Sequence, residues 1–172
     1  MNERREGAVT LKGNPITLLG AAVEANEDAP EFTALKDLVT STSLSDSSGK
    51  VRVLLSVPSL DTPVCAIETK RFNDEAAKLG DDVLVQVISV DTPFAQSRWC
   101  GAEGVKNVQA LSDFKNRDFG TKYGVEIEGL GIYARAAFVV DRQGVVVYSE
   151  YVPEVANEPN YEAILGAARA AV

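Results

Sequence analysis

Hydrophobic and polar positions divide the chain into short elements. The alternating stretch VTLKGNPITLLG, which turns at Gly-Asn-Pro, predicts an N-terminal β-hairpin over residues 9–20. Two continuous runs, VRVLLSV (51–57) and VLVQVISV (83–90), are rich in valine, leucine and isoleucine and predict buried strands. Further strands are predicted at 108–111, 133–140 and 145–152, the last two joined by the turn DRQG.

Helical patterns fill gaps between these strands. Residues 63–79 form the longest predicted helix, with Gly80 after its last turn. A short helix capped by Ser112 is expected to end near Gly124, and a terminal helix is expected over residues 160–171. The rest is expected to be extended at 32–44, a loop at 45–50 and an irregular or short helical connection at 91–104. This order favours an α/β fold, related to thioredoxin, with a mixed central sheet flanked by helices.

Length and composition indicate one globular domain over residues 1–172. The chain is 45% hydrophobic and 24% charged, which is typical of a folded protein that buries a core. Its formal net charge of −8 makes nucleic acid and anionic membrane surfaces unfavourable partners. The N-terminal residues carry charges rather than an apolar signal segment, and no run is long enough to span a membrane. We therefore expect a cytoplasmic protein.

The chain contains two cysteines and no histidine. The absence of histidine excludes Ser-His-Asp and Cys-His catalysis, and two cysteines alone do not make a standard structural zinc site. Carboxylate, hydroxyl and thiol chemistry remain. In a reducing compartment the two cysteines are expected to be free, metal-binding or redox-active rather than a permanent disulfide.

The first cysteine, Cys65, lies where a predicted strand gives way to a predicted helix. Pro63 suits the first helical position, which makes Thr62 the N-cap and Cys65 the third helical residue. A capping threonine accepts a hydrogen bond from the second or third N–H of the helix, so its hydroxyl is expected beside Cys65. The positive end of the helix dipole and the unpaired N–H groups there favour thiolate over thiol.

Helical spacing also predicts where the sulfur points. Cys65 shares a stripe with other residues three or four positions apart, namely Thr69, Phe72, Ala76 and Leu79. Because most of this stripe is apolar, the sulfur is expected in a pocket at the edge of the core. The alternative is that Cys65 is simply a small buried hydrophobic residue, which is the ordinary role of a free cysteine.

Two further residues are candidates for thiol chemistry. Cys100 lies in SRWCGAEG, where two glycines suggest a segment that can bend; the alternative is that it only packs beside Trp99 and Phe94. Arg135 interrupts an apolar strand and must be paired or exposed. It is either an ion-pair partner of a carboxylate such as Glu126 or Glu128, or a fixed cation beside the thiolate that binds oxygen atoms.

Several motifs resemble those of a known family. The pattern Pro58-x-x-x-Thr62-x-x-Cys65 resembles the peroxidatic motif of peroxiredoxins. More closely, the chain resembles bacterial thiol peroxidases, which are atypical two-cysteine peroxiredoxins. The matching segments are SLDTPVC, DTPFAQSRWCGAEG, LSDFKNRDFGTKYGV, ARAAFVVDRQGVVVYSEYVPEVANEPNYEAIL and the N-terminal hairpin. The resemblance covers nearly the whole chain.

The resemblance implies a role for each candidate residue. Cys65 matches the peroxidatic cysteine and Cys100 the resolving cysteine, with which it would form an intramolecular disulfide. Thr62 matches the hydroxyl that binds thiolate and peroxide, Arg135 the arginine that activates the thiolate, and Pro58 the residue that shields the pocket. The resemblance also implies a thioredoxin-like fold, a homodimer, no cofactor and no metal, a peroxide substrate, and thioredoxin as the reductant.

Three other interpretations compete with a peroxidase. One is a chaperone or signalling role for an oxidised form of the protein. A dithiol oxidoreductase of the thioredoxin type would need a close Cys-x-x-Cys pair, which the sequence lacks. A non-enzymatic thioredoxin-fold binding or redox-sensing module would bury both cysteines and use Arg135 only in an ion pair. Thiol titration separates the peroxidase from the binding module, because one fast-reacting, low-pKa thiol supports the peroxidase and two inert thiols support the module.

Overall fold

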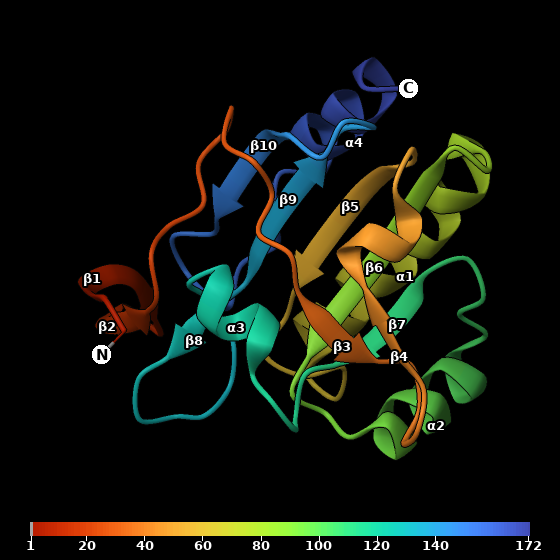
Figure 1. Ribbon diagram of the computed structural model, residues 1–172. Coiled ribbons are helices and arrows are strands. Elements are labelled where there is room, and N and C mark those ends of the chain that lie inside the picture. Colours follow the sequence, from red (N-terminus) through yellow and green to blue (C-terminus); the bar gives the residue numbers. More distant parts are fainter. Residues whose placement is uncertain (1) are drawn as a thin grey trace.

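A seven-stranded mixed sheet forms the centre of the computed structural model, which describes residues 2–172 (Figure 1). Its strand order is β10-β9-β5-β6-β7-β3-β4. These strands are β3 (Thr33–Leu35), β4 (Ser41–Ser43), β5 (Val51–Ser56), β6 (Val83–Ser89), β7 (Gln109–Ser112), β9 (Ala136–Val140) and β10 (Val146–Tyr151). The predicted mixed sheet is confirmed: β5, β6 and β7 are parallel, and the outer strands are antiparallel.

Helices cover both faces of this sheet. They are α1 (Pro63–Leu79), α2 (Pro93–Glu103), α3 (Asp118–Lys122) and α4 (Tyr161–Ala170), with a short 3-10 helix at Leu44–Ser47. One core packs β5, β6 and β9 against α1 and α4, with Phe72 and Ile164 among its buried residues. A second core lies on the opposite face, where Phe32 and Phe119 are fully buried. Because β5 lies between both cores, every one of its residues is buried.

The N-terminal hairpin forms a second, smaller sheet. It consists of β1 (Arg4–Leu11) and β2 (Asn14–Leu19), and β8 (Glu126–Ile127) pairs with β2 (Figure 1). The hairpin prediction is confirmed, although the first strand begins earlier than residue 9. Backbone hydrogen bonds from Thr10 to Pro153 and from Val155 to Thr10 attach the hairpin to the segment that follows β10. The hairpin turn is therefore held beside the carboxyl end of β5, where the site described below lies.

For the connection at 91–104 the helical alternative is confirmed, whereas the predicted cap at Ser112 needs correction. The connection at 91–104 is a regular helix, because the Thr92 hydroxyl accepts the Ala95 N–H at 3.3 Å and Pro93 occupies the first helical position. Ser112 does not cap the short helix before Gly124. It is the last residue of β7, and its hydroxyl donates to the carbonyl of Asp91 instead. The helix α3 begins only after Arg117, whose φ of +54° turns the chain.

Candidate active site

The carboxyl end of β5 brings four of the five predicted site residues together, all but Cys100. Pro58 and Thr62 belong to the loop between β5 and α1, and Cys65 lies in the first turn of α1. Strand β9 is antiparallel to β5 and pairs Ala136 with Ser56, so Arg135, one residue before β9, lies at the same end. The sequence separation of 70 positions between Cys65 and Arg135 is closed entirely by this strand pairing.

The sulfur of Cys65 is fully buried and contacts one cation. The exposed fraction of Cys65 is 0%, and Arg135 Nη2 donates to its Sγ at 3.3 Å. The predicted stripe is confirmed at its N-terminal end, because Thr69 and Phe72 are also fully buried. A guanidinium at this distance, together with the start of a helix, is an arrangement that stabilises a thiolate.

The Thr62 hydroxyl does not make the bond expected from the sequence. Thr62 is the N-cap residue and Pro63 follows it, as predicted, but no side chain caps α1. The hydroxyl donates instead to the carbonyl of Ser59 at 3.0 Å. As a result, the N–H groups of the first turn of α1 receive no side-chain acceptor, and the Thr62 oxygen keeps its lone pairs for another donor.

Arg135 has a second charged partner that the sequence analysis did not identify. The expected pairs with Glu126 and Glu128 do not form: Glu128 pairs with Arg4 at 2.8 Å, and the nearest cation to Glu126 is Arg117 at 3.9 Å. Arg135 Nη1 instead pairs with Glu68, which is completely buried in α1, and its Nε donates to the carbonyl of Val155 at 3.1 Å. Three fixed acceptors therefore hold the guanidinium in one orientation.

The buried charges shift one another's pKa values. Burial raises the pKa of Glu68 to about 7, and the favourable charge of Arg135 offsets only part of this effect. Burial alone would lower the pKa of Arg135, but the negative charges of Glu68 and Cys65 outweigh it, so the pKa of Arg135 is raised. Arg135 consequently stays protonated while Glu68 changes charge near neutral pH.

A mostly apolar pocket of about 460 Å³ opens onto this arrangement. Pro58, Thr62 and Arg135 all contribute to its wall. The other lining residues are Leu11, Lys12, Pro63, Val64, Ile132, Val155 and Ala156. Leu11 and Lys12 come from the N-terminal hairpin, which the bonds to residues 153 and 155 hold in place. A small molecule in this pocket can reach the guanidinium that contacts the sulfur.

The second cysteine occupies a different environment. Cys100 lies in the last turn of α2, is partly buried, and packs against the core that contains Cys65. Burial raises the pKa of its thiol. Both cysteines are free thiols. Of the two packing partners considered for Cys100, Trp99 is buried, whereas Phe94 is 67% exposed.

Comparisons with known proteins identify the family. Residues 24–165 match the Redoxin family model. A thiol peroxidase from Bacillus subtilis is 51% identical over 164 residues, which cover 95% of this chain and 98% of that protein. The chain belongs to the thiol peroxidase family. A thiol peroxidase from Listeria monocytogenes is 47% identical over 163 residues, covering 95% of this chain and 98% of that relative.

Solved structures agree with this family assignment. A peroxiredoxin-like protein from Aquifex aeolicus superposes with a TM-score of 0.90 at 41% identity, covering 99% of both chains. A thiol peroxidase from Chromobacterium violaceum superposes with a TM-score of 0.81 and covers 91% of both chains; at 23% identity it supports the fold alone. The predicted membership in the peroxiredoxins and the predicted thioredoxin-like fold are both confirmed.

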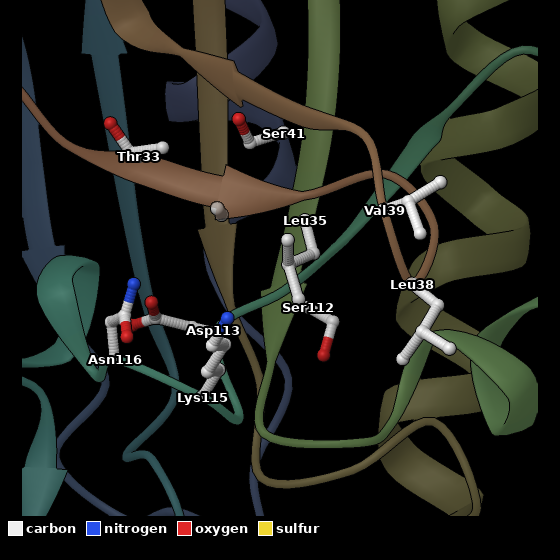
Figure 2. Close-up of a pocket in the computed structure, with 10 residues that line it drawn as sticks. Thr33, Leu35, Leu38, Val39, Ser41, Ser112, Asp113, Lys115 and Asn116 are labelled. Carbon is white, nitrogen blue, oxygen red and sulfur yellow. The ribbon is translucent and has the colours of Figure 1, made fainter.

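A second cavity, of about 250 Å³, shares no lining residue with the candidate site at Cys65 (Figure 2). Figure 2 shows it between the β3–β4 hairpin, with Leu38 and Val39 at the tip, and the residues that follow β7. Its one carboxylate, Asp113, already accepts hydrogen bonds from the N–H groups of Asp118 and Gly120 and from the Tyr133 hydroxyl. This carboxylate is thus committed to holding α3 and offers little for catalysis.

Neither a metal-binding cluster nor a membrane-spanning helix occurs among residues 2–172. Within residues 2–172, no group of three or more histidine, cysteine, aspartate or glutamate side chains is arranged to hold a metal ion. Among these described residues, no helix is both long enough and apolar enough to cross a membrane.

Two polar residues near the site were missed by the sequence analysis. Glu68 is three positions after Cys65, so helical spacing already placed it on the buried side of α1. Asp91 follows β6 and contacts the loop that leads to Cys65. Its only sequence signal is that Asp91-Thr92-Pro93 repeats the motif Asp61-Thr62-Pro63.

Proposed function

We propose that this protein is a thiol-dependent peroxidase that reduces hydrogen peroxide and organic hydroperoxides, with Cys65 as the peroxidatic residue. The observation that carries the proposal is the 3.3 Å contact between Arg135 Nη2 and the Cys65 sulfur at the start of α1. A thiolate is the reactive form of cysteine, and this position favours it. Membership in the thiol peroxidase family supports the same activity.

In the first step, the Cys65 thiolate attacks the terminal oxygen of ROOH. The S–O bond forms as the O–O bond breaks, so sulfur is oxidised to a sulfenic acid and the peroxide is reduced. The leaving oxygen takes a proton and departs as water or an alcohol. Thr62 and Arg135 hold the two oxygens in line and Arg135 stabilises the developing negative charge, while Pro58 limits the access of water.

In the second step, Cys100 acts as the resolving residue. Its thiol attacks the sulfenic acid of Cys65, which forms an intramolecular disulfide and releases water. Because Cys65 is fully buried, the first turn of α1 must unwind and the segment around Cys100 must move. Helix ends open at low cost, which suits a site that must be closed for attack and open for resolution. An external dithiol then reduces the disulfide by exchange.

The remaining features complete the proposal. The apolar lining of the pocket, with only Lys12 and Arg135 charged, favours organic hydroperoxides alongside hydrogen peroxide. We also propose thioredoxin as the reductant, a homodimer, a cytoplasmic location, a single peroxiredoxin domain over residues 1–172, and catalysis that needs no cofactor. The net charge of −8 argues against nucleic acid or a membrane surface as a partner.

A coupled assay tests the proposal. Peroxide is supplied with thioredoxin, thioredoxin reductase and NADPH, and NADPH oxidation is followed. The wild-type chain should turn over continuously and Cys65→Ser should not turn over. Cys100→Ser should consume a single equivalent of peroxide and then stop, because its sulfenic acid has no resolving partner. Normal thioredoxin-dependent turnover by Cys100→Ser would overturn the resolving role, and normal turnover by Cys65→Ser would overturn the whole mechanism.

A further inference from the structure

Asp91 connects the segments that carry the two cysteines. It lies between β6 and α2, immediately before the Thr92-Pro93 start of the helix that bears Cys100. Its carboxylate accepts hydrogen bonds from the Ser59 hydroxyl at 2.7 Å, the Leu60 N–H at 2.9 Å and the Ser89 hydroxyl at 2.7 Å. Two of these donors belong to the loop that leads into α1. An acceptor with three short bonds fixes the position of that loop.

Ser59 transmits this restraint to Thr62. The Ser59 hydroxyl, which donates to Asp91, also lies 3.2 Å from the N–H of Asp61 and accepts its hydrogen bond. The Ser59 carbonyl accepts two bonds from Thr62, one from its N–H at 3.2 Å and one from its hydroxyl at 3.0 Å. The orientation of the Thr62 hydroxyl in the pocket wall is therefore set by Ser59, which is itself held by Asp91.

We propose that Asp91 is a positioning residue for peroxide reduction and acts through Ser59 on Thr62. It touches neither the sulfur nor the pocket, so its effect is on geometry: it keeps the Thr62 oxygen where it can accept a hydrogen bond from the O–H of the peroxide. The inference rests on the proposed function, because it concerns the same site. Asp91, which precedes the helix that carries Cys100, thereby influences how fast Cys65 reacts with peroxide.

Asp61 provides an internal comparison. It occupies the same place in its Asp-Thr-Pro motif as Asp91, but it is exposed, and its carboxylate pairs with Arg98 at 3.3 Å. An exposed pair of this kind contributes little to structure. Replacing Asp61 by Asn should therefore leave the geometry of Thr62 unchanged, which makes Asp61→Asn the matched control for Asp91→Asn.

The test is a double-mutant cycle in the Cys100→Ser background, measured as the rate constant for peroxide oxidation of Cys65. Thr62→Val should slow oxidation by about 100-fold, since it removes the oxygen that accepts a hydrogen bond from the O–H of the peroxide and holds it in line with the sulfur. Asp91→Asn should slow it about tenfold through misplacement of the same group. If Asp91 acts through Thr62, adding Asp91→Asn to Thr62→Val should cost less than about twofold more. Asp61→Asn should change the rate by less than about twofold.

A second measurement separates positioning from general damage. Alkylation of Cys65 by iodoacetamide does not need the Thr62 hydroxyl to hold a peroxide, so Asp91→Asn should alter its rate by less than about threefold. If Asp91→Asn does not fold, Ser59→Ala is the substitute. It removes the hydrogen bond between Ser59 and Asp91 and leaves the bonds from Leu60 and Ser89 to Asp91 intact. Ser59→Ala should then slow Cys65 oxidation about tenfold when Thr62 is present. In the Thr62→Val variant, Ser59→Ala should cause no further slowing.

The outcomes distinguish the inference from the proposed function. If Cys65 in the Cys100→Ser background does not react with peroxide at all, the proposed function fails. If it reacts and Asp91→Asn or Ser59→Ala reacts equally fast, only the positioning role is overturned. Multiplicative losses in the double variant would also overturn it, since they would mean that Asp91 acts independently of Thr62.

Discussion

Two helices of this protein begin with the same three residues, Asp-Thr-Pro, yet their first turns are held in different ways. In α2, the Thr92 hydroxyl accepts the Ala95 N–H and caps its own helix. In α1, the Thr62 hydroxyl donates to the Ser59 carbonyl, and no side chain caps the helix. The difference arises because Asp91 holds the loop before α1 in a turn that presents a carbonyl to Thr62. An identical local sequence thus makes a stable helix start in one place and an open one in the other.

The two cysteines also differ in their position along the helix and in their charged neighbours. Cys65 is in the first turn of its helix, where the dipole favours negative charge, and contacts Arg135. Cys100 is in the last turn of its helix, where the dipole disfavours negative charge, and burial raises the pKa of its thiol. The comparison teaches that the helix end and the charged neighbour, rather than the Asp-Thr-Pro motif, separate a thiol suited to attack from one suited to resolve.

The largest expected effect is on oxidation of the two thiols. With peroxide present, Cys65 in the Cys100→Ser variant should form a sulfenic acid roughly a thousandfold faster than Cys100 does in Cys65→Ser, because only Cys65 lies beside the Arg135 guanidinium and the Thr62 hydroxyl, which can hold a peroxide. Trapping with a sulfenic-acid reagent, followed by mass spectrometry, measures both rates. Comparable rates at both positions would remove the distinction between the two helix environments.

Removing Arg135 should reduce the difference between the oxidation rates of Cys65 and Cys100. Arg135→Ala is best made together with Glu68→Gln, because otherwise a buried carboxylate is left without its cation. Oxidation of Cys65 should slow by about 100-fold to 1000-fold, since the loss removes a charged donor from the transition state. Glu68→Gln alone is the matched control and should retain most of the rate. A double variant as fast as this control would show that Arg135 has no part in the reaction.

The two threonines should respond in opposite ways. Thr62→Val should slow Cys65 oxidation by about 100-fold while changing stability little, because its hydroxyl caps no helix. Thr92→Val should destabilise the fold by about 1 kcal/mol through loss of the cap, with the rate of Cys65 oxidation within about twofold of wild type. Urea unfolding and peroxide kinetics on both variants check this pair, and the same response from both would contradict the structural contrast.

A pH-dependent effect on stability, rather than on the rate of Cys65 oxidation, is expected from the glutamate three positions after Cys65. Glu68 is buried and its pKa is raised from 4.5 to about 7, so the folded state favours its neutral form. Its contribution to stability is therefore complete below about pH 4.5 and is lost as the pH rises toward 7. Glu68→Gln should remove this decline, which amounts to at most about 3 kcal/mol.

Urea unfolding between about pH 4.5 and 7 measures how the free energy of unfolding changes with pH. Glu103, three positions after Cys100, is exposed and pairs with Lys70, so Glu103→Gln is the control and should keep the wild-type pH dependence. If the free energy of unfolding of Glu68→Gln changed with pH as much as that of the wild type, Glu68 would have to be ionised throughout this range.

Elements whose residues repeat regularly were predictable from the sequence. The buried strands β5 and β6, the helix over 63–79 and both hairpins follow from apolar runs, turn residues and end signals that act within a few positions. The helix start at Pro63 and the burial of the Cys65 stripe followed for the same reason. Helix α2 was less clear because its sequence lacks a continuous apolar stripe, and α3 because Arg117 starts it with a positive φ.

The candidate site was predictable in its residues but not in its contacts. Cys65, Thr62, Pro58 and Arg135 lie together at the carboxyl end of β5, as expected. The suggested partners of Arg135, Glu126 and Glu128, were wrong, because the fold places Glu68, 67 residues away along the chain, beside the guanidinium. The hydrogen bond of Thr62 was also wrong, since it depends on the position of Asp91, 29 residues away along the chain.

The sequence by itself determined the alternation of strands and helices, the position of one thiol at the start of a helix, and a chemistry without histidine. These properties depend on residue identity and on spacing over one or two turns. Only the tertiary structure decided that Arg135 faces Cys65 and Glu68, and that Thr62 is held by Ser59 rather than by its own helix. Such contacts depend on which strands pair in the sheet, because that pairing brings distant side chains within bonding distance in a dry interior where charges interact strongly.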